Sequence, residues 1–360
     1  MKDKSHIQIT SPARLHLGFM DLNGSLGRKF GSVGLAIDSI ETSITVSKNS
    51  MQNDIEINEV NKRAYAYAEL MLKAYEVDES VKINVHKKIP EHAGLGSGTQ
   101  LALTVGVAIS KLFNLNLSLM DIGKVLDRGN RSGIGIGAFK NGGFLIDGGK
   151  GKSAELPPIT VRQNFPENWR IILLINSREK GIHGQKEYNA FKTLKPFPED
   201  LSEKTCRLVN MVILPSLIEK NFNDFSASIG KLQKIVGTHF SPIQGGVYSN
   251  PDIANIMNYV EQNGFMGVGQ SSWGPTGFIL TDSDTAAHKL TKDIRQNFLC
   301  KDLKIEIIKG RNQGSCIEFI SRHKGSQTKN LNIHKEYIMN KPIIMHMITT
   351  AKNLSPFDVN

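Results

Sequence analysis

The sequence predicts an α+β protein built from two domains, on three observations. The chain of 360 residues is long enough for two separate hydrophobic cores. Short segments with the apolar pattern of strands alternate with longer segments that have the apolar period of helices. A proline-containing segment at 154–167 precedes a fully apolar strand at 169–175, which marks the start of a second unit. We therefore expect a first domain over 1–160, an α/β sandwich over 161–322, and a polar linker and tail over 323–360.

The net charge of +10 is compatible with nucleic-acid binders and with enzymes that take polyanionic small substrates. The basic residues are scattered and the aromatic content is only 7%, which favours the enzyme and argues against nucleic-acid binding. No apolar run reaches about 18 residues, so we expect no membrane span. Cys206, Cys300 and Cys316 are widely spaced, and residues 1–6 lack the apolar core of a signal peptide. These features predict a cytoplasmic protein with reduced thiols.

The first elements are a strand at 7–10 and an extended segment at 11–21. Arg14 and His16 share one face of this segment, because side chains on a strand alternate with period two. Two polar groups near glycines suggest ligand contacts, although a solvated strand face would also contain them. A strand pair follows Arg28 and ends near residue 46, and residues 58–75 have the apolar stripe of a helix.

The segment at 89–100 (IPEHAGLGSGTQ) lies between a strand at 81–85 and an apolar helix at 100–113. Glycines allow close approach of the backbone to a ligand, and Ser97 or Thr99 is expected to cap the helix. The first N–H groups of a helix favour anions. The segment therefore predicts a phosphate cradle, with an ordinary capped loop as the alternative. Its candidate phosphate- or pyrophosphate-binding residues are Gly94, Gly96, Ser97, Gly98, Thr99 and Gln100.

Ser118 is expected to cap a helix that ends near residue 128. After it, glycines occupy every second position from 133 to 137, beside Arg128 and Arg131. We expect a second anion-binding loop here. In the second domain we expect helices at 205–219, 223–236, 251–263 and 284–298, and strands at 278–281, 305–308 and 315–320. A third glycine-rich segment lies at 267–277.

Three motifs in this order, PARLH at 12–16, GLGSG at 94–98 and GQSSWG at 269–274, resemble the GHMP kinase superfamily. The resemblance implies an N-terminal domain like the second domain of ribosomal protein S5 and a C-terminal ferredoxin-like domain. Kinases of this superfamily that have a catalytic aspartate place it in a Ser-Gly-x-Asp motif. The matching position here is Gly135. That difference argues against phosphoryl transfer to an alcohol, which needs a proton acceptor.

Longer motifs resemble a non-kinase branch of the superfamily, the β-ribofuranosylaminobenzene 5′-phosphate synthases. They are SPARLHLGF at 11–19, the segment at 89–100, RGNRSGIG at 128–135, QGGVY at 244–248 and GQSSWGPT at 269–276. The resemblance implies condensation of phosphoribosyl pyrophosphate with 4-aminobenzoate or 4-hydroxybenzoate, with loss of pyrophosphate and CO2, in methanopterin biosynthesis. It is also consistent with a homodimer. An ATP-dependent GHMP small-molecule kinase and an RNA-binding protein remain the alternatives.

For that reaction the candidate catalytic residues are His16, His92 and Arg14, and both histidines have a structural hydrogen-bonding role as the alternative. Arg28, Arg128 and Arg131 are further phosphate candidates. The candidate substrate pocket is Gln270, Ser271, Ser272 and Trp273, where Trp273 is equally suited to a core. The expected cofactor is Mg²⁺, near the hydroxyls of Ser97 and Thr99. Residues 339–360 resemble the start of methylene-tetrahydromethanopterin dehydrogenase, with an unrelated tail as the alternative.

Overall fold

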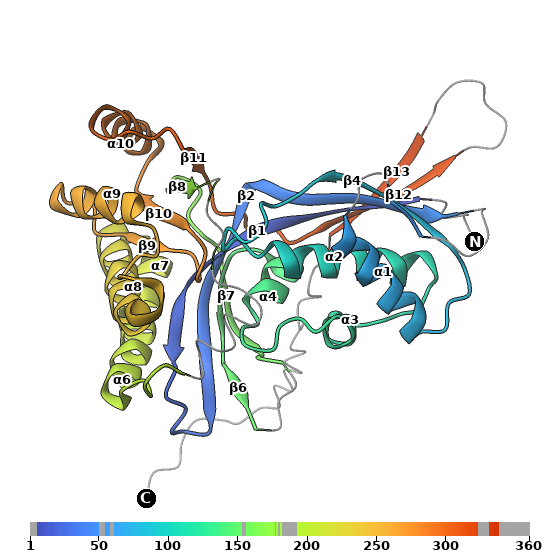
Figure 1. The fold of residues 1–360 in the computed structure, drawn as a ribbon, viewed down its shortest axis with the longest axis horizontal. Helices are drawn as coiled ribbons and strands as arrows, with labels where there is room; N and C mark the ends of the chain where they lie inside the picture. Colours follow the sequence, from blue (N-terminus) through green and yellow to red (C-terminus); the bar gives the residue numbers. More distant parts are fainter. Residues whose placement is uncertain are drawn as a thin grey trace, which may run out of the picture.

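The computed structural model describes residues 6–49, 55–57, 61–152, 156–176, 178, 181, 193–322 and 331–337. Within these residues it has two antiparallel-rich sheets with helices packed on them (Figure 1), so the α+β prediction is confirmed. None of the helices described is long and apolar enough to cross a membrane.

The larger sheet has the order β13-β12-β1-β2-β4-β3, with β5 and β6 paired to β2 and β7 paired to β5. Its strands are β1 (His6–Asp21), β2 (Arg28–Lys48), β3 (Glu56–Ile57), β4 (Val81–Lys87), β5 (Phe144–Asp147), β6 (Lys150–Gly151), β7 (Ile159–Gln163), β12 (Cys316–Arg322) and β13 (Leu331–Tyr337). The helices of this part are α1 (Lys62–Ala74), α2 (Ser97–Leu112), α3 (Leu119–Val125) and α4 (Ile134–Asn141). Of these, α2 and α4 contact β1 and β2, and α3 packs against α1 and α2 (Figure 1).

The smaller sheet has the order β11-β8-β10-β9. Its strands are β8 (Arg170–Asn176), β9 (Val268–Gln270), β10 (Thr276–Thr281) and β11 (Leu303–Ile308). The helices of this part are α6 (Glu199–Leu208), the π-helix η1 (Val209–Ile213), α7 (Leu214–Glu219), α8 (Phe222–Gln244), α9 (Pro251–Gln262) and α10 (Asp284–Asn297). The predicted alternation of helices and strands in the second half is confirmed.

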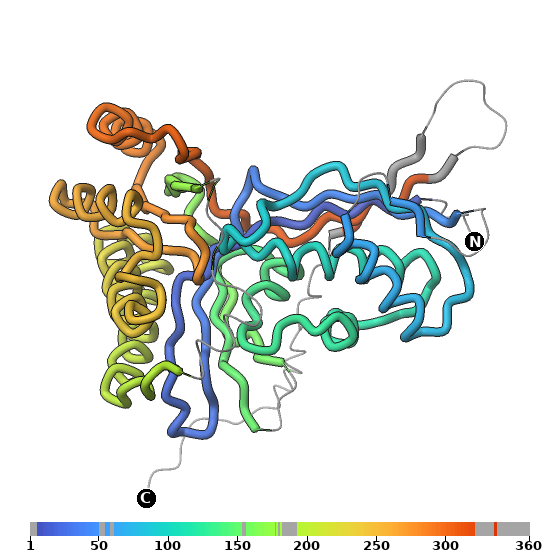
Figure 2. Tube along the Cα trace, in the orientation of Figure 1, coloured from blue at the N-terminus to red at the C-terminus, as the bar shows by residue number. Residues whose placement is uncertain are grey.

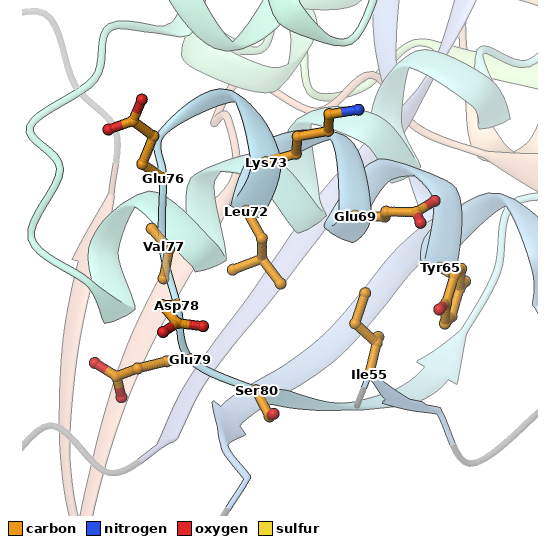
Figure 3. A pocket seen from close by; sticks show the side chains of 10 residues that line it. All are labelled: Ile55, Tyr65, Glu69, Leu72, Lys73, Glu76, Val77, Asp78, Glu79 and Ser80. Carbon is orange, nitrogen blue, oxygen red and sulfur yellow. The ribbon is translucent and has the colours of Figure 1, made fainter. Parts of the chain in front are cut away.

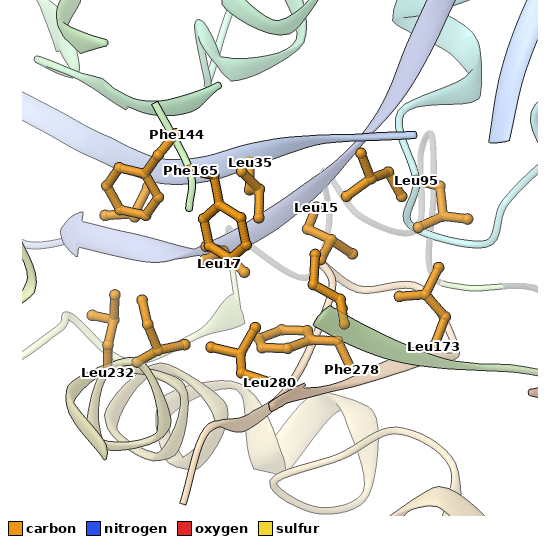
Figure 4. Packing of buried hydrophobic residues seen from close by; sticks show 14 of the residues in the cluster. Leu15, Leu17, Leu35, Leu95, Phe144, Phe165, Leu173, Leu232, Phe278 and Leu280 are labelled. Atoms are coloured by element: carbon orange, nitrogen blue, oxygen red, sulfur yellow. The ribbon is translucent and has the colours of Figure 1, made fainter. Parts of the chain in front are cut away.

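The hairpin of β1 and β2 belongs to both halves of the molecule. Its register shifts at Pro12/Ala13 and at His16/Gly18, and such bulges bend a strand and increase its twist. From the first bulge onward, apolar side chains of β1 pack against the second domain: Leu15 and Leu17 lie in one core cluster with Leu232 and Phe278 (Figure 4). Because both domains bury apolar area in this shared core, the hairpin fixes their relative position.

The structure corrects the second half of the loop predicted at 127–139. Residues 134–141 form α4, although glycine disfavours helix by about 1 kcal/mol. The reason is packing: a Cβ at Gly137 would lie 2.8 Å from Cδ1 of Ile159, and one at Gly135 would lie 2.8 Å from Cγ2 of Thr99. The glycines therefore let α4 approach its neighbours closely, rather than forming a loop around an anion.

The structure also corrects the C-terminal elements. The strand expected at 315–320 in the second domain is β12, which pairs with β1 from His6↔Ile320 to Thr10↔Cys316 in the larger sheet. Figure 2 shows the late part of the chain returning beside its start. The burial of Ile317 and Phe319 against the α1–α2 core accounts for this placement. The predicted linker likewise contains a strand, β13, which pairs with β12. The segment 339–360 lies outside the described residues.

Candidate active site

The N-terminus of α2 is open toward the glycine-rich segment. Its N-cap is Gly96, in the left-handed region at φ 84°, and no side chain caps the helix. The expected cap by Ser97 or Thr99 is therefore wrong. The first helical hydrogen bond runs from the Gln100 N–H to the Gly96 carbonyl at 3.0 Å. The N–H groups of residues 97–99 precede the first intrahelical bond, which leaves them available to an anion.

Two glycine-rich loops touch at this point. A Cβ at Gly94 would lie 2.1 Å from the Ser271 carbonyl oxygen, and one at Gly274 would lie 2.2 Å from the Gly94 nitrogen. Ser271 joins them, because its hydroxyl donates to the Gly94 carbonyl at 2.8 Å and accepts the His16 N–H at 3.1 Å. The His16 carbonyl in turn accepts the Ser272 N–H at 3.3 Å. The three sequence motifs thus meet around one carbonyl, that of Gly94.

Arg14 holds the same loop from β1. Its guanidinium donates to the Gly94 carbonyl, and its backbone N–H donates to the Leu95 carbonyl at 3.1 Å. A Cβ at Gly96 would lie 3.2 Å from Cγ of Arg14. These contacts make Arg14 a positioning residue for the loop, and its predicted catalytic role remains a prediction.

Two arginines converge on the first turn of α2. The position of a Cβ at Gly98 lies 2.3 Å from Nη2 of Arg63 and 3.9 Å from Nη1 of Arg128. Both guanidiniums donate to the Tyr67 hydroxyl, at 3.4 Å from Arg63 and 2.7 Å from Arg128. Glu91 is the carboxylate nearest to Arg63, at 3.7 Å. Two cations beside the positive end of a helix form a site for a polyanion.

Arg128 was expected here from the sequence, whereas Arg63 was missed. Arg63 lies in the first turn of α1, and no motif distinguishes it from the other basic residues of the chain. The only signal is its spacing of four from Tyr67, which is visible once the helix is assigned.

The structure places Arg28 apart from these groups. Its guanidinium donates to the carbonyls of Gly148 and Gly149 at 2.7 Å each. Arg14 pairs with Ala36 on β2, and Arg28 lies eight residues before Ala36, which is about 26 Å along a strand. Arg131 lies half-buried between α3 and α4. Arg28 thus supports the turn before β6 instead of joining the α2 site.

Gly135 packs on the first turn of α2. The Gln100 side-chain amide donates to the Gly135 carbonyl at 2.8 Å, and the methyl group of Thr99 fills the space beside the Gly135 Cα. A carboxylate at position 135 would collide with Thr99. At the position where the kinases have an aspartate, this chain therefore has no carboxylate, and Thr99 occupies the space that one would need.

His16 is buried, with 4% of its surface exposed. Burial, and then the charge of Arg14, lower the pKa of its imidazole to about 3, so the ring is neutral at neutral pH. Within the described part of the chain, Nε2 of His16 has no hydrogen-bond partner. The residue lines a cavity of about 20 Å³ whose other lining residues include Phe19, Phe240, Gln244, Gln270 and Trp273.

Three of the predicted pocket residues, Gln270, Ser272 and Trp273, line this cavity, whereas Ser271 does not. Gln270 accepts the Ser249 N–H at 2.7 Å and donates to the Ser272 carbonyl at 3.0 Å. Trp273 is 4% exposed and packs edge-on against Phe240, with ring centroids 4.7 Å apart. It therefore belongs to the core while it also walls the cavity. His92 is half-buried in the glycine-rich segment, and its carbonyl accepts the Gly181 N–H at 2.9 Å.

A depression of about 600 Å³ beside α1 is a poor site for a polyanion (Figure 3). Its lining includes four carboxylates and one lysine, at Glu69, Glu76, Asp78, Glu79 and Lys73. Because like charges repel, this lining disfavours a phosphorylated substrate.

Comparison with known proteins agrees with this geometry. The model of the GHMP kinases N terminal domain matches residues 62–143, and that of the GHMP kinases C terminal domain matches residues 213–299. A β-ribofuranosylphenol 5′-phosphate synthase of Methanocaldococcus jannaschii is 37% identical over 311 residues, which cover 78% of this chain and 91% of that protein. The chain belongs to the β-ribofuranosylphenol 5′-phosphate synthase family. The resemblance seen in the motifs is thus confirmed.

Other relatives support the synthase family and its fold. The β-ribofuranosylphenol 5′-phosphate synthase of Archaeoglobus fulgidus is 31% identical over 328 residues, covering 87% of this chain and 99% of that protein. A mevalonate pyrophosphate decarboxylase structure from Streptococcus pyogenes has a TM-score of 0.63 at 16% identity, covering 86% of this chain and 98% of that one. Mevalonate kinase of Methanococcus jannaschii has a TM-score of 0.61 at 17% identity, covering 86% and 99%. The predicted two-domain GHMP fold is confirmed.

The neutral state of His16 in this synthase-family chain predicts a pH effect on stability. Its folded pKa of about 3 lies below the ordinary value of 6.5, so the unfolded chain binds the extra proton as pH falls through 6.5. We expect the free energy of unfolding to drop by about 2 kcal/mol from pH 7.5 to pH 5 through this group alone.

Urea unfolding of the wild type and of His16→Leu at both pH values measures that effect. Burial raises the pKa of Asp147, which acts in the opposite direction, but it does so equally in both proteins and cancels in the comparison. If the free energy of unfolding changed equally with pH in the two proteins, His16 would have to be protonated at pH 5 in the folded protein as well as in the unfolded chain.

Proposed function

We propose that the protein condenses phosphoribosyl pyrophosphate with 4-aminobenzoate or 4-hydroxybenzoate. Pyrophosphate and CO2 leave, and a β-ribofuranosyl arene 5′-phosphate of tetrahydromethanopterin biosynthesis is formed. Membership of the synthase family supports this reaction. The observation that carries it is the polyanion site at the open N-terminus of α2, beside a position at which a catalytic carboxylate is excluded.

Pyrophosphate is held at α2 in this proposal. The N–H groups of residues 97–99 point from the first turn, and Arg63 and Arg128 lie beside Gly98. As the bond between the ribose first carbon and the pyrophosphate oxygen breaks, the electron pair leaves with pyrophosphate. Fixed donors and cations stabilise that added negative charge without having to reorganise.

The second half of the reaction needs no base. The ring carbon that bears the carboxylate attacks the ribose first carbon, assisted by the lone pair of the 4-substituent. The bond to the carboxylate then breaks, and its electron pair restores aromaticity as CO2 departs. The group lost from the ring is CO2 and not a proton, so this chemistry suits a site with Gly135 and a neutral His16. An alcohol kinase would need a proton acceptor there.

Mg²⁺ is proposed to enter with the substrate, bound to its pyrophosphate. Within the described residues no group of three or more His, Cys, Asp or Glu side chains is placed to hold a metal. Mg²⁺ commonly depends on substrate phosphates for much of its coordination. The hydroxyls of Ser97 and Thr99 are available beside such a complex. A cytoplasmic location, in line with the free thiols of Cys206, Cys300 and Cys316, and a homodimer remain further proposals.

The test is release of labelled CO2 from carboxyl-labelled 4-aminobenzoate, and from the 4-hydroxy analogue, with phosphoribosyl pyrophosphate and Mg²⁺. We expect CO2 and pyrophosphate in equal amounts, only when phosphoribosyl pyrophosphate is present. A parallel assay supplies ATP and small alcohols. ATP turnover without CO2 release would instead identify a kinase that works without an aspartate at position 135.

A further inference from the structure

The cavity beside His16 is mostly apolar, with a few polar groups, and is the size of one small group. A space of about 20 Å³ is enough for about one water molecule, and a hydroxyl or amino group is of similar size. Its lining combines the aromatic rings of Phe19, Phe240 and Trp273 with the amides of Gln244 and Gln270. Such a lining suits a ligand that is flat and apolar with one hydrogen-bonding end.

His16 lines this cavity and carries a buried ring nitrogen that the protein leaves unsatisfied. The residue is more than nine-tenths buried, and Nε2 has no hydrogen-bond partner among the described residues. A buried polar atom without a partner costs about 1–3 kcal/mol, so such atoms commonly mark the position of a water or a ligand.

The cavity adjoins both solvent and the pyrophosphate site. Gln244 and Val247 line it and also an open groove of about 600 Å³ beside α8 and α9, which gives a small molecule a way in. On the other side, the Ser271 hydroxyl joins His16 to the Gly94 carbonyl, at 3.1 and 2.8 Å. A molecule anchored at His16 therefore lies beside the loop that leads into α2.

The charges of the two sites indicate which substrate binds at the N-terminus of α2 and which binds in the cavity beside His16. Arg63 and Arg128 converge at α2 and favour the substrate with several phosphate charges, whereas His16 is neutral and its cavity is lined by uncharged side chains. We propose that this cavity binds the 4-hydroxyl or 4-amino group of the arene, with Nε2 of His16 as its hydrogen-bond partner. The inference rests on the proposed function and adds the residue that recognises the second substrate.

The arrangement also activates the ring. The 4-substituent is opposite the attacking carbon, so in this proposal the ring extends from His16 toward the glycine-rich loop that Ser271 connects to the His16 backbone. A neutral imidazole that accepts a hydrogen bond from the substituent leaves its lone pair available to the ring. A cation at the same place would withdraw that density.

Two ligands of equal shape test the proposal, 4-hydroxybenzoate and 4-methylbenzoate. Their affinities are measured by equilibrium dialysis with magnesium pyrophosphate present, for the wild type, His16→Leu and His239→Leu. His239 packs against Phe240 but does not line the cavity, which makes it the matched control. We expect about tenfold preference for the hydroxyl ligand in the wild type and His239→Leu, and a loss of preference in His16→Leu.

A measurement on the unaltered protein makes the test independent of folding of the variant. With ¹⁵N-labelled histidine, burial gives low pKa values to the imidazoles of His16 and His239, and the spectrum of His239→Leu distinguishes them. The nitrogen signals of His16 should shift with 4-hydroxybenzoate but not with 4-methylbenzoate. Equal affinities in the wild type, an unchanged preference in His16→Leu, or no selective shift would each overturn the inference. If product still forms alongside any of these results, the proposed reaction is retained and only the role of His16 in arene binding is rejected. If no product forms, the proposed reaction itself is rejected.

Discussion

Gly94→Ala is expected to destabilise the protein by about 3–5 kcal/mol and to abolish measurable product formation. Gly94 has φ 79°, where an added Cβ costs about 1–2 kcal/mol. The new atom would also lie 2.1 Å from the Ser271 carbonyl oxygen, and backbone on both sides prevents easy relief. The two loops would have to separate, and the hydrogen bonds from Ser271 and Arg14 to the Gly94 carbonyl would be lost.

Gly27→Ala is the matched control for this experiment. Gly27 has φ 83°, and nothing lies within 4 Å of its added Cβ, so only the conformational cost remains. Urea unfolding and the initial rate of pyrophosphate release are measured for both variants. Equal unfolding midpoints for Gly94→Ala and Gly27→Ala would show that contact between the two loops is unimportant.

Replacing Arg63 or Arg128 by Met is expected to raise the KM for phosphoribosyl pyrophosphate by about 30-fold each, with little effect on the KM for the arene. Hydrogen bonds to charged groups contribute about 1.5–3 kcal/mol, which corresponds to that range of affinity. The free variants should lose little stability, because repulsion between the two guanidiniums offsets part of their contacts with Tyr67 and of the Arg63–Glu91 pair.

Arg28→Met provides the control, since Arg28 lies far along β2 and binds the turn at Gly148 and Gly149. Steady-state kinetics of all three variants at low and moderate salt distinguish the sites. A larger KM increase for Arg28→Met than for Arg63→Met would place the pyrophosphate at the other end of the hairpin.

The sequence allowed prediction of those parts of the site that depend on local pattern. Alternation along a strand was enough to place Arg14 and His16 on one face, and the change from a strand to an apolar helix located the open end of α2. Arg128 was found because it accompanies a glycine-rich motif. Arg63 was missed because its role depends on the packing of α1 beside α2, a contact between elements that no local pattern records.

The errors have a similar cause. Glycines at every second position suggested a loop, but their purpose is the close approach of α4 to Thr99 and Ile159. Arg28 was grouped with the phosphate ligands, although it lies eight residues along β2 from Ala36, the residue that pairs with Arg14. Position 135 lacked a carboxylate in the sequence, yet only the structure revealed that Thr99 leaves no room for one.

The pairing of β12 with β1 also affects how the chain is made. Residues 6–10 of β1 pair with β2 on one side and with β12 on the other. β12 is synthesised about 300 residues after residues 6–10, an interval of about 15–60 s at typical elongation rates. Throughout that interval the β1 edge that carries Ile7 and Ile9 has no β12 to cover it, and such edges invite pairing with other chains. A nascent chain paused before β12 should therefore be a target for chaperones, although all of the first domain's helices have already emerged.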